Sequence, residues 1–303
     1  MIGGQALIEG ILMRGPTKQA VSVRTKDGIV TTEEELKLVK DRYPILGWPL
    51  IRGVVNFGDS MVKGVKALTY SAELMPEDEQ GEPDKLDKWI EEKVGNEKAQ
   101  KVIVAIAVVL GLGLSVGLFI LLPTLLAGFL DSFVTSRILR NALEGGVRIA
   151  IFLVYLTLCS RMEDIARTFA YHGAEHKCIH CYEKGLPLTV DNVRIQPRQH
   201  PRCGTSFLFV VMIVSMLIFS VVSWSSPWAR MGLRLLLLPV VVGISYEINR
   251  WIGRHDNFLT AALSAPGKAL QNLTTNEPDD SMIEVAIEAL ERVIPERDGT
   301  DKW

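Results

Sequence analysis

Residues 102–130, VIVAIAVVLGLGLSVGLFILLPTLLAGFL, form an apolar run without a single charged side chain. A helix of about 20 such residues crosses the hydrocarbon core of a bilayer. Shorter apolar stretches follow at 147–159, 207–224 and 231–246. The stretch 147–159 is short for a crossing unless the helix also includes Asn141–Gly146. The sequence therefore predicts a mainly α-helical, polytopic membrane protein with about four spans, the last two forming a hairpin.

The overall charge gives no argument for a nucleic-acid partner. Lys and Arg number 33 against 35 Asp and Glu, which leaves a net charge of −2, and the basic residues are dispersed along the chain. Nucleic-acid binders concentrate positive charge on one face. The N-terminus lacks a cationic lead into an apolar run with a cleavage site, so no removable signal peptide is predicted. The partner that the composition indicates is the lipid bilayer.

The polar loop 161–206 decides the predicted orientation. It is rich in Lys and Arg, whereas the turn between the last two spans carries only Arg230. By the positive-inside rule the loop, with both termini, should face the cytosol of a bacterial cell as part of a multi-pass protein. Arg137, Arg140 and Arg148 count against this orientation because they would then lie outside. The clear spans contain almost no ionisable residue, which disfavours a transporter.

The segments outside the spans have their own signals. Within 1–75, a glycine-rich segment, Ala20–Arg24 and Ile29–Thr32 flank an Asp-Gly turn and predict a small β-hairpin. Pro44–Leu74 predicts an amphipathic helix, either at the membrane surface or in a soluble core. The remaining regions are an acidic linker (76–100), a first transmembrane pair (101–160), a His/Cys-rich loop (161–206), a transmembrane hairpin (207–248) and a C-terminal segment (249–303).

The C-terminal segment predicts a second amphipathic helix. Apolar residues recur at helical spacing between Ile283 and Ile294, and Ser281 with Glu284 matches a capping box. Such a helix would dock on the cytosolic face of the protein or bind a protein partner. A homo-oligomer is a further expectation that the sequence leaves open.

Four of the five histidines fall within the polar loop. His172-Gly-Ala-Glu175-His176 has the His-x-x-Glu-His order of inverted zinc peptidases, in which two imidazoles hold the metal and the carboxylate moves protons. Residues three and four apart share a helix face, so the three side chains should converge, with His180 one turn further. We therefore expect His172 and His176 to bind a divalent metal, most simply zinc, with Glu175 as the catalytic residue.

Further ligands must come from elsewhere in the chain. His200 and Cys203, in a proline-glycine turn on the same side of the membrane, are the preferred choice. Glu247, at the end of the last span, is the alternative, although an ion pair explains it slightly better. In an active site, Arg202 or Lys177 could stabilise developing negative charge.

A competing metal site uses the cysteines. Cys178-x-x-Cys181, followed by His200-x-x-Cys203, has the spacing of a structural zinc site. On a continuous helix Cys178 and Cys181 would point away from the histidine face, so both sites can exist only if the helix breaks near Lys177. A third alternative is that the histidines only form hydrogen bonds.

Several blocks together resemble a known family. These blocks are Gly3-Gly4-Gln5-Ala-Leu-Ile-Glu9-Gly10 with Met13-Arg14-Gly15, Tyr171-His172-Gly-Ala-Glu175-His176-Lys177, His200-Pro-Arg-Cys203-Gly-Thr-Ser206, and Glu277-Pro-Asp-Asp280. Through them almost the whole chain resembles the YqhQ-like family of bacterial membrane proteins, known as domain of unknown function 1385. The resemblance implies a multi-span membrane protein and a metal-dependent enzyme. It brings no established activity, substrate or ligand set.

The family pattern stresses the histidines and Cys203 more than Cys178 and Cys181, which favours the first metal site. It also singles out the opening block, where Glu9 and Arg14 lie among glycines that would fit a segment folded against the histidine loop, or a plain turn. The leading hypothesis is a metal-dependent hydrolase at the cytosolic membrane face. The alternative is a non-catalytic chaperone, transporter component or assembly scaffold with a structural His/Cys loop.

Overall fold

A computed structural model describes residues 2–36, 43–76, 96–129, 136–221, 227–255 and 257–295. Residues 77–95 of the predicted linker and residues 222–226 at the predicted hairpin turn lie outside this set. The chain divides into two compact units. One comprises residues 1–74, 155–218 and 236–303, and the other comprises residues 75–154 and 219–235.

The elements follow one another in this order: β1 (Gly3–Leu7), β2 (Gly10–Arg14), β3 (Lys18–Thr25), β4 (Gly28–Glu35), η1 (Pro44–Gly47), α2 (Ile51–Glu73), α4 (Asn96–Val116), η2 (Gly117–Leu121), α5 (Leu122–Phe129), α6 (Arg137–Cys159), α7 (Glu163–Glu183), α8 (Val190–Arg194), α9 (Gly204–Val221), α10 (Pro227–Arg254), α11 (Phe258–Thr274) and α12 (Asp280–Glu291). The mainly helical class is confirmed.

Among the described residues, three stretches of helix are long and apolar enough to cross a membrane. They are Val102–Leu126, Leu139–Cys159 and Met231–Arg254, and Gly204–Ser220 in α9 is a shorter apolar helix. The second stretch shows how the short run at 147–159 reaches sufficient length, because α6 begins at Arg137 and so includes the residues before it.

The N-terminal strands form one antiparallel sheet in the order β1-β2-β3-β4. The predicted hairpin is confirmed as β3 and β4, with Thr25 opposite Gly28 at the turn. Strands β1 and β2 were not predicted. Their register pairs Gly3 with Arg14 and Leu7 with Gly10, so the opening glycine-rich block is regular β structure.

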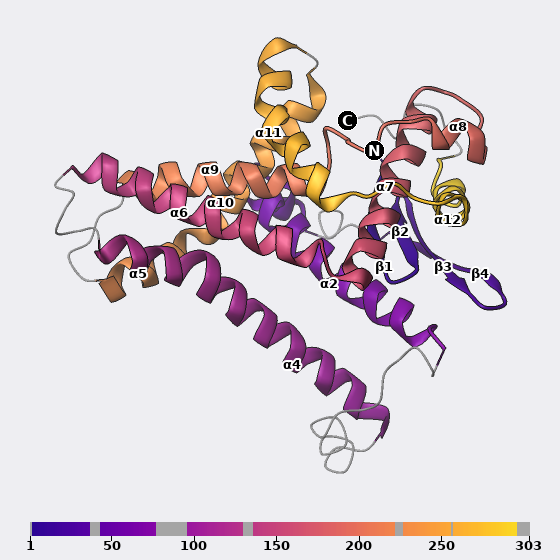
Figure 1. Ribbon diagram of the computed structural model, residues 1–303, viewed down its shortest axis with the longest axis horizontal. Coiled ribbons are helices and arrows are strands. Elements are labelled where there is room, and N and C mark those ends of the chain that lie inside the picture. Colours follow the sequence, from indigo (N-terminus) through magenta and orange to yellow (C-terminus); the bar gives the residue numbers. More distant parts are fainter. Residues whose placement is uncertain are drawn as a thin grey trace. The chain divides into compact units, whose positions relative to one another are not determined.

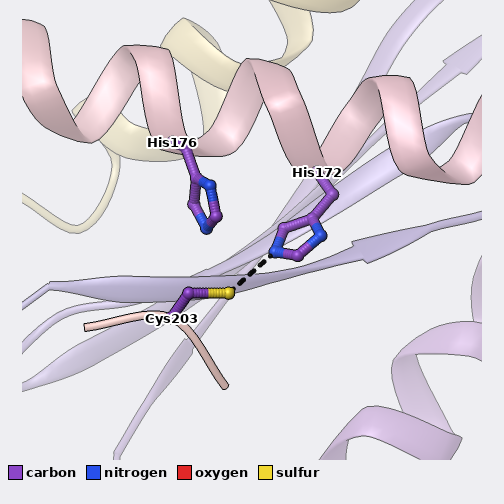
Figure 2. Close-up of side chains that lie close together, drawn as sticks. All are labelled: His172, His176 and Cys203. Carbon is purple, nitrogen blue, oxygen red and sulfur yellow. Dashed lines mark hydrogen bonds between the residues drawn. The ribbon is translucent and has the colours of Figure 1, made fainter. Parts of the chain in front are cut away.

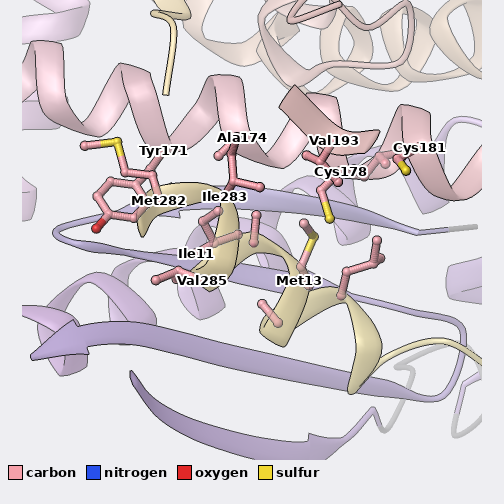
Figure 3. Packing of buried hydrophobic residues seen from close by; sticks show 14 of the residues in the cluster. Ile11, Met13, Tyr171, Ala174, Cys178, Cys181, Val193, Met282, Ile283 and Val285 are labelled. Carbon is pink, nitrogen blue, oxygen red and sulfur yellow. The ribbon is translucent and has the colours of Figure 1, made fainter. Parts of the chain in front are cut away.

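Helices α7 and α12 pack against this sheet and bury one shared apolar core (Figure 1). Figure 3 shows side chains from the strands, α7 and α12 meeting there. The largest fully buried side chains in this core include Ile11, Met13, Tyr171, Ile283 and Leu290. The apolar stripe of the predicted C-terminal helix is thus buried within the chain itself. A protein partner for this helix stays a prediction.

The capping box predicted from Ser281 and Glu284 is wrong. Asp279 caps α12, since its side chain accepts a hydrogen bond from the backbone N–H of Met282. Glu284 instead forms an ion pair with Arg24 of β3, with 2.6 Å between Oε2 and Nη2. Glu284 therefore contacts Arg24, which is distant in sequence, instead of forming the capping box with Ser281.

The second unit contains a buried polar cluster. Arg234 Nη2 lies 2.8 Å from Glu144 Oε2, and Arg148 Nη2 lies 3.3 Å from Glu144 Oε1. Thr124 Oγ1 lies 3.2 Å from the same carboxylate. Because Glu144 and Arg148 belong to Leu139–Cys159 and Arg234 to Met231–Arg254, the expectation of nearly charge-free spans is wrong.

Candidate functional site

Helix α7 presents a row of imidazoles. It runs without a break from Glu163 to Glu183, so His172, His176 and His180 follow at one-turn intervals. The ring centroids of His172 and His176 are 4.4 Å apart. His200, from the loop before α9, lies 5.7 Å from the ring of His176 and 4.6 Å from that of His180. The four loop histidines therefore lie together in the structure.

His172, His176 and Cys203 form what we term the first donor group. The ligand atom that each offers lies within 4.8 Å of the other two. His172 Nε2 is 3.2 Å from Cys203 Sγ. Figure 2 shows both imidazoles pointing from α7 toward the sulfur. Two imidazoles and one thiol are a donor set that zinc accepts.

Backbone carbonyls fix which nitrogen of each imidazole is available. His172 Nδ1–H donates to the carbonyl of Thr274 at 2.8 Å, and His176 Nδ1–H donates to that of Arg198 at 2.5 Å. In a neutral imidazole this leaves Nε2 as the lone-pair nitrogen. Nε2 of His176 is buried and has no hydrogen-bond partner among the described residues. Metal-binding histidines usually have such a carbonyl on the other ring nitrogen.

Cys203 is held by the loop between α8 and α9. It directly precedes α9, and the backbone N–H of Thr205 donates to its Sγ at 3.4 Å. Gln271 of α11 braces the loop, accepting from His200 N–H at 2.7 Å and donating to the His200 carbonyl at 2.8 Å and to Ser206 Oγ at 3.0 Å. Gln271 was not predicted, because a single glutamine in a helix forms no recognisable sequence motif.

A glycine lets the chain after α11 approach α7. Asn276 N–H donates to the Phe169 carbonyl at 2.8 Å, which ties this segment to the helix. A side chain at Gly173 would collide with the carbonyl oxygen of Asn276. The close approach that glycine allows is what places the Thr274 carbonyl beside His172.

Glu175 is buried between α7 and β1. Its side chain accepts from the backbone N–H of Gly4, and its Oε2 has no partner among the described residues. A Cβ atom on Gly4 would lie 2.9 Å from Glu175 Cδ. Burial raises the pKa of Glu175, while the charges of His172 and His200 act against that rise. The carboxyl group therefore takes up a proton more readily than an exposed one.

Burial also keeps the imidazoles neutral. It lowers the pKa of His176, and it lowers the pKa of His180 and of His200 to about 4. These three side chains are consequently uncharged at pH 7. Neutral imidazole is the form that binds a metal.

The opening block lies against α7. Glu9 forms a two-point ion pair with Arg167, with 2.6 Å for each contact, and accepts from the Tyr171 hydroxyl at 3.2 Å. Arg14 instead forms an ion pair with Asp59 of α2 at 2.8 Å. Glu9 and Arg14 thus tie elements together, and neither belongs to a donor group.

Three other candidates also form ion pairs. The buried Lys177 pairs with Glu277 and donates to the Arg194 carbonyl at 2.7 Å. Arg202 pairs with Glu183. Glu247 pairs with Arg52, with 2.7 Å between Oε1 and Nε. For this residue we had slightly favoured an ion pair over a role as metal ligand.

Cys178 and Cys181 lie in the apolar core, on the side of α7 that faces the sheet and α12 (Figure 3). Burial raises the pKa of the Cys178 thiol well above its ordinary value. Neither cysteine joins a donor group among the described residues. The helix break near Lys177 that both sites together would need is absent from α7.

A second donor group consists of His180, Glu183 and His200, whose ligand atoms lie within 4.8 Å of one another. His200, which we expected beside His172 and His176, belongs to this second group. Glu183 was not among the predicted residues. Its spacing of three from His180 was the available signal, but exposed charged pairs at that spacing are common in helices.

These features define a mainly helical protein that has, in the part of the chain that the structure describes, three helices apolar enough to cross a membrane and a cluster of potential metal ligands. The chain belongs to the family described as "Protein of unknown function (DUF1385)", which matches residues 48–296. It is 34% identical over 297 residues to "Uncharacterized protein YqhQ" of Bacillus subtilis (strain 168), covering 96% of this chain and 92% of that protein. No solved structure shows significant similarity to the chain.

Proposed function

We propose that this protein is a multi-pass protein of the bacterial cell membrane that binds a divalent metal ion, zinc in the first instance, through His172, His176 and Cys203. The observation that carries the proposal is the orientation of the donors. Both imidazoles give Nδ1–H to a carbonyl, which leaves each Nε2 lone pair beside Cys203 Sγ. Because burial excludes water from His176 Nε2, which has no hydrogen-bond partner among the described residues, a bound ion would satisfy that nitrogen.

We further propose that the site is hydrolytic and faces the cytosol. Catalytic zinc sites use three protein ligands and leave one position open, whereas structural sites are closed by four. The first donor group offers three. Because loop 161–206 is rich in Lys and Arg, the positive-inside rule supports the cytosolic side.

A zinc ion held by these residues would supply hydroxide near neutral pH by lowering the pKa of water to about 7. Glu175 would accept the proton that the attacking water loses, because burial raises its pKa. It would then return that proton to the leaving group. One bond forms between water oxygen and the acyl or phosphoryl atom, the bond to the leaving group breaks, and no redox partner is needed.

Metal analysis of the purified full-length protein in detergent tests metal binding. We expect the wild type to retain zinc, and His172→Ala, His176→Ala and Cys203→Ser each to lose about one zinc per chain. Cys159→Ser and His255→Ala are matched controls outside both donor groups and should keep the wild-type content. A wild type without metal, or a loss seen only with Cys178→Ala, would contradict the proposal.

The hydrolytic step needs a separate test. Glu175→Gln should retain zinc but lower the hydrolysis of p-nitrophenyl acetate or p-nitrophenyl phosphate by roughly 10²- to 10⁴-fold, because it removes the proton acceptor. Equal rates for this variant and the wild type would exclude the role of Glu175. The absence of zinc-dependent turnover of either ester would favour the scaffold alternative.

A further inference from the structure

The second donor group stands at the C-terminal end of α7. His180 and Glu183 occupy the last turn of the helix, and His200 faces them from the loop before α9. His200 Nε2 lies 3.3 Å from Glu183 Oε2. The His200 side chain is buried, and that of Glu183 is about one third exposed, at 34%. The group is thus sheltered on one side and reachable on the other.

Hydrogen bonds orient both imidazoles of this group, although in a different way from the first group. His180 Nε2–H donates to the Gln199 carbonyl at 2.9 Å, which leaves Nδ1 with the lone pair. The backbone N–H of Arg202 donates to His200 Nδ1 at 3.3 Å, so Nε2 of His200 carries the proton that faces Glu183. A divalent ion would lie between the imidazole and the carboxylate once the proton on Nε2 has moved to Nδ1, which gives up the 3.3 Å contact from Arg202 N–H.

Arg202 orients the carboxylate of Glu183. The guanidinium of Arg202 pairs with its Oε1, while Oε2 faces His200. An ionised carboxylate with one oxygen left for a metal is a common ligand. Arg202, which the sequence suggested as a stabiliser of negative charge, therefore positions a ligand.

The two donor groups are continuous. Ring centroids follow at 4.4 Å from His172 to His176, 5.7 Å from His176 to His200 and 4.6 Å from His200 to His180. The second group therefore begins where the first ends.

We propose that His180, Glu183 and His200 bind a second divalent metal ion, so that α7 carries a two-metal centre. This inference rests on the proposed metal binding by the first donor group. Metal ions in hydrolases polarise and orient substrate oxygens. The substrate class that such a centre takes is an oxyanion ester, a phosphate ester above all, because two cations and the nearby charge of Lys268 favour a dianion.

The number of metal ions per chain tests the inference. The full-length protein in detergent is loaded with zinc, passed through a desalting column and analysed for zinc and protein. We expect two zinc ions per chain in the wild type and one in Glu183→Gln and in His180→Gln. Glu73→Gln and His255→Gln are matched controls outside both groups and should keep two. Each variant must elute from size exclusion at the wild-type volume, and two substitutions guard against one that fails to fold.

The outcomes separate this inference from the proposed function. One zinc in the wild type, unchanged in Glu183→Gln, overturns the second site and leaves the first in place. Two zinc ions in both Glu183→Gln and His180→Gln also overturn it, because the second ion would then lie elsewhere. No zinc in the wild type overturns the proposed function and this inference with it.

Discussion

Close packing around Glu175 depends on Gly4 and not on its neighbour Gly3. A Cβ atom on Gly4 would lie 2.7 Å from the Leu12 carbonyl oxygen and 2.9 Å from Glu175 Cδ, whereas Gly3 has nothing within 4 Å. Gly4→Ala should therefore lower the free energy of unfolding by roughly 1–3 kcal/mol through overpacking. Gly3→Ala should change it by less than about 0.5 kcal/mol. Chemical denaturation in detergent measures both, and equal effects would contradict the described packing.

Arg14 acts on the pKa of Asp59. Burial alone would raise the pKa of this carboxyl group, but hydrogen bonds from Arg14 and Lys63 outweigh burial and hold it below its ordinary value. The unfolded chain therefore takes up a proton first as the pH falls. The stabilisation is complete above about pH 5 and is lost as the pH falls through the unfolded-state and then the folded-state pKa.

Arg14→Met should weaken this dependence. Between about pH 5 and about pH 3 the melting temperature of the wild type should fall more steeply than that of the variant, since the variant has less charge pairing to lose. Thermal melts at several pH values give both slopes. Parallel profiles would show that the Arg14–Asp59 pair does not contribute.

The residues of the site were predictable where the chemistry follows helical spacing. His172 and His176, four residues apart, had to share a face of any helix, and their rings do lie together. The Thr274 and Arg198 carbonyls that orient these rings were not predictable, because every residue has a carbonyl and only the fold selects one. Gln271 was missed for the related reason that its partners lie far away in sequence.

At the scale of elements, the start of α12 offers a direct comparison. Asp279 accepts from Met282 N–H at 3.0 Å, and Ser281, which the sequence pattern favoured as the cap, lies inside the helix. Asp279→Ala should lower the free energy of unfolding by about 1 kcal/mol through loss of the cap. Ser281→Ala should cost clearly less. The reverse order in denaturant melts would contradict the described helix start.

The sheet shows why some elements could be predicted and others could not. The Asp-Gly turn between β3 and β4 is a strong local signal, and the hairpin is present. Strands β1 and β2 carry glycines at Gly3, Gly4 and Gly10, and glycine weakens the sequence signal of a strand. The pairing of β1 with β2 and of β2 with β3, together with the cover of α7 and α12, makes them strands.

At the scale of the whole molecule, the buried ion pairs in the second unit contribute to the free energy of unfolding. Glu144 faces Arg234 and Arg148, and all three side chains are buried. Glu144→Ala should lower the stability by roughly 3–5 kcal/mol, because it leaves buried guanidinium charge without its carboxylate. Combining it with Arg234→Met should restore part of the loss.

Thermal unfolding in detergent measures the Glu144 effect. Glu73→Ala, which removes an exposed glutamate at the end of α2, should be close to neutral and serves as the control. A Glu144→Ala variant as stable as this control would show that the buried pair contributes nothing. Composition could not reveal this pair, because an apolar helix is recognised by its many apolar residues and a few charged side chains do not change that pattern.

The site also depends on contacts between distant parts of the chain. His172 meets Thr274 across 102 positions of sequence, and Cys203 across 31. No local pattern encodes such pairings, so the sequence analysis could propose ligands but could not separate the two donor groups.

The central claim is that His172, His176 and Cys203 share one metal ion, and the X-ray absorption spectrum of the protein loaded with one zinc per chain tests it most directly. The account predicts one sulfur ligand at about 2.3 Å and nitrogen ligands at about 2.0–2.1 Å, with the sulfur lost in Cys203→Ser. Two or more sulfur ligands, or a sulfur that remains in Cys203→Ser, would contradict it and assign the zinc to Cys178 and Cys181.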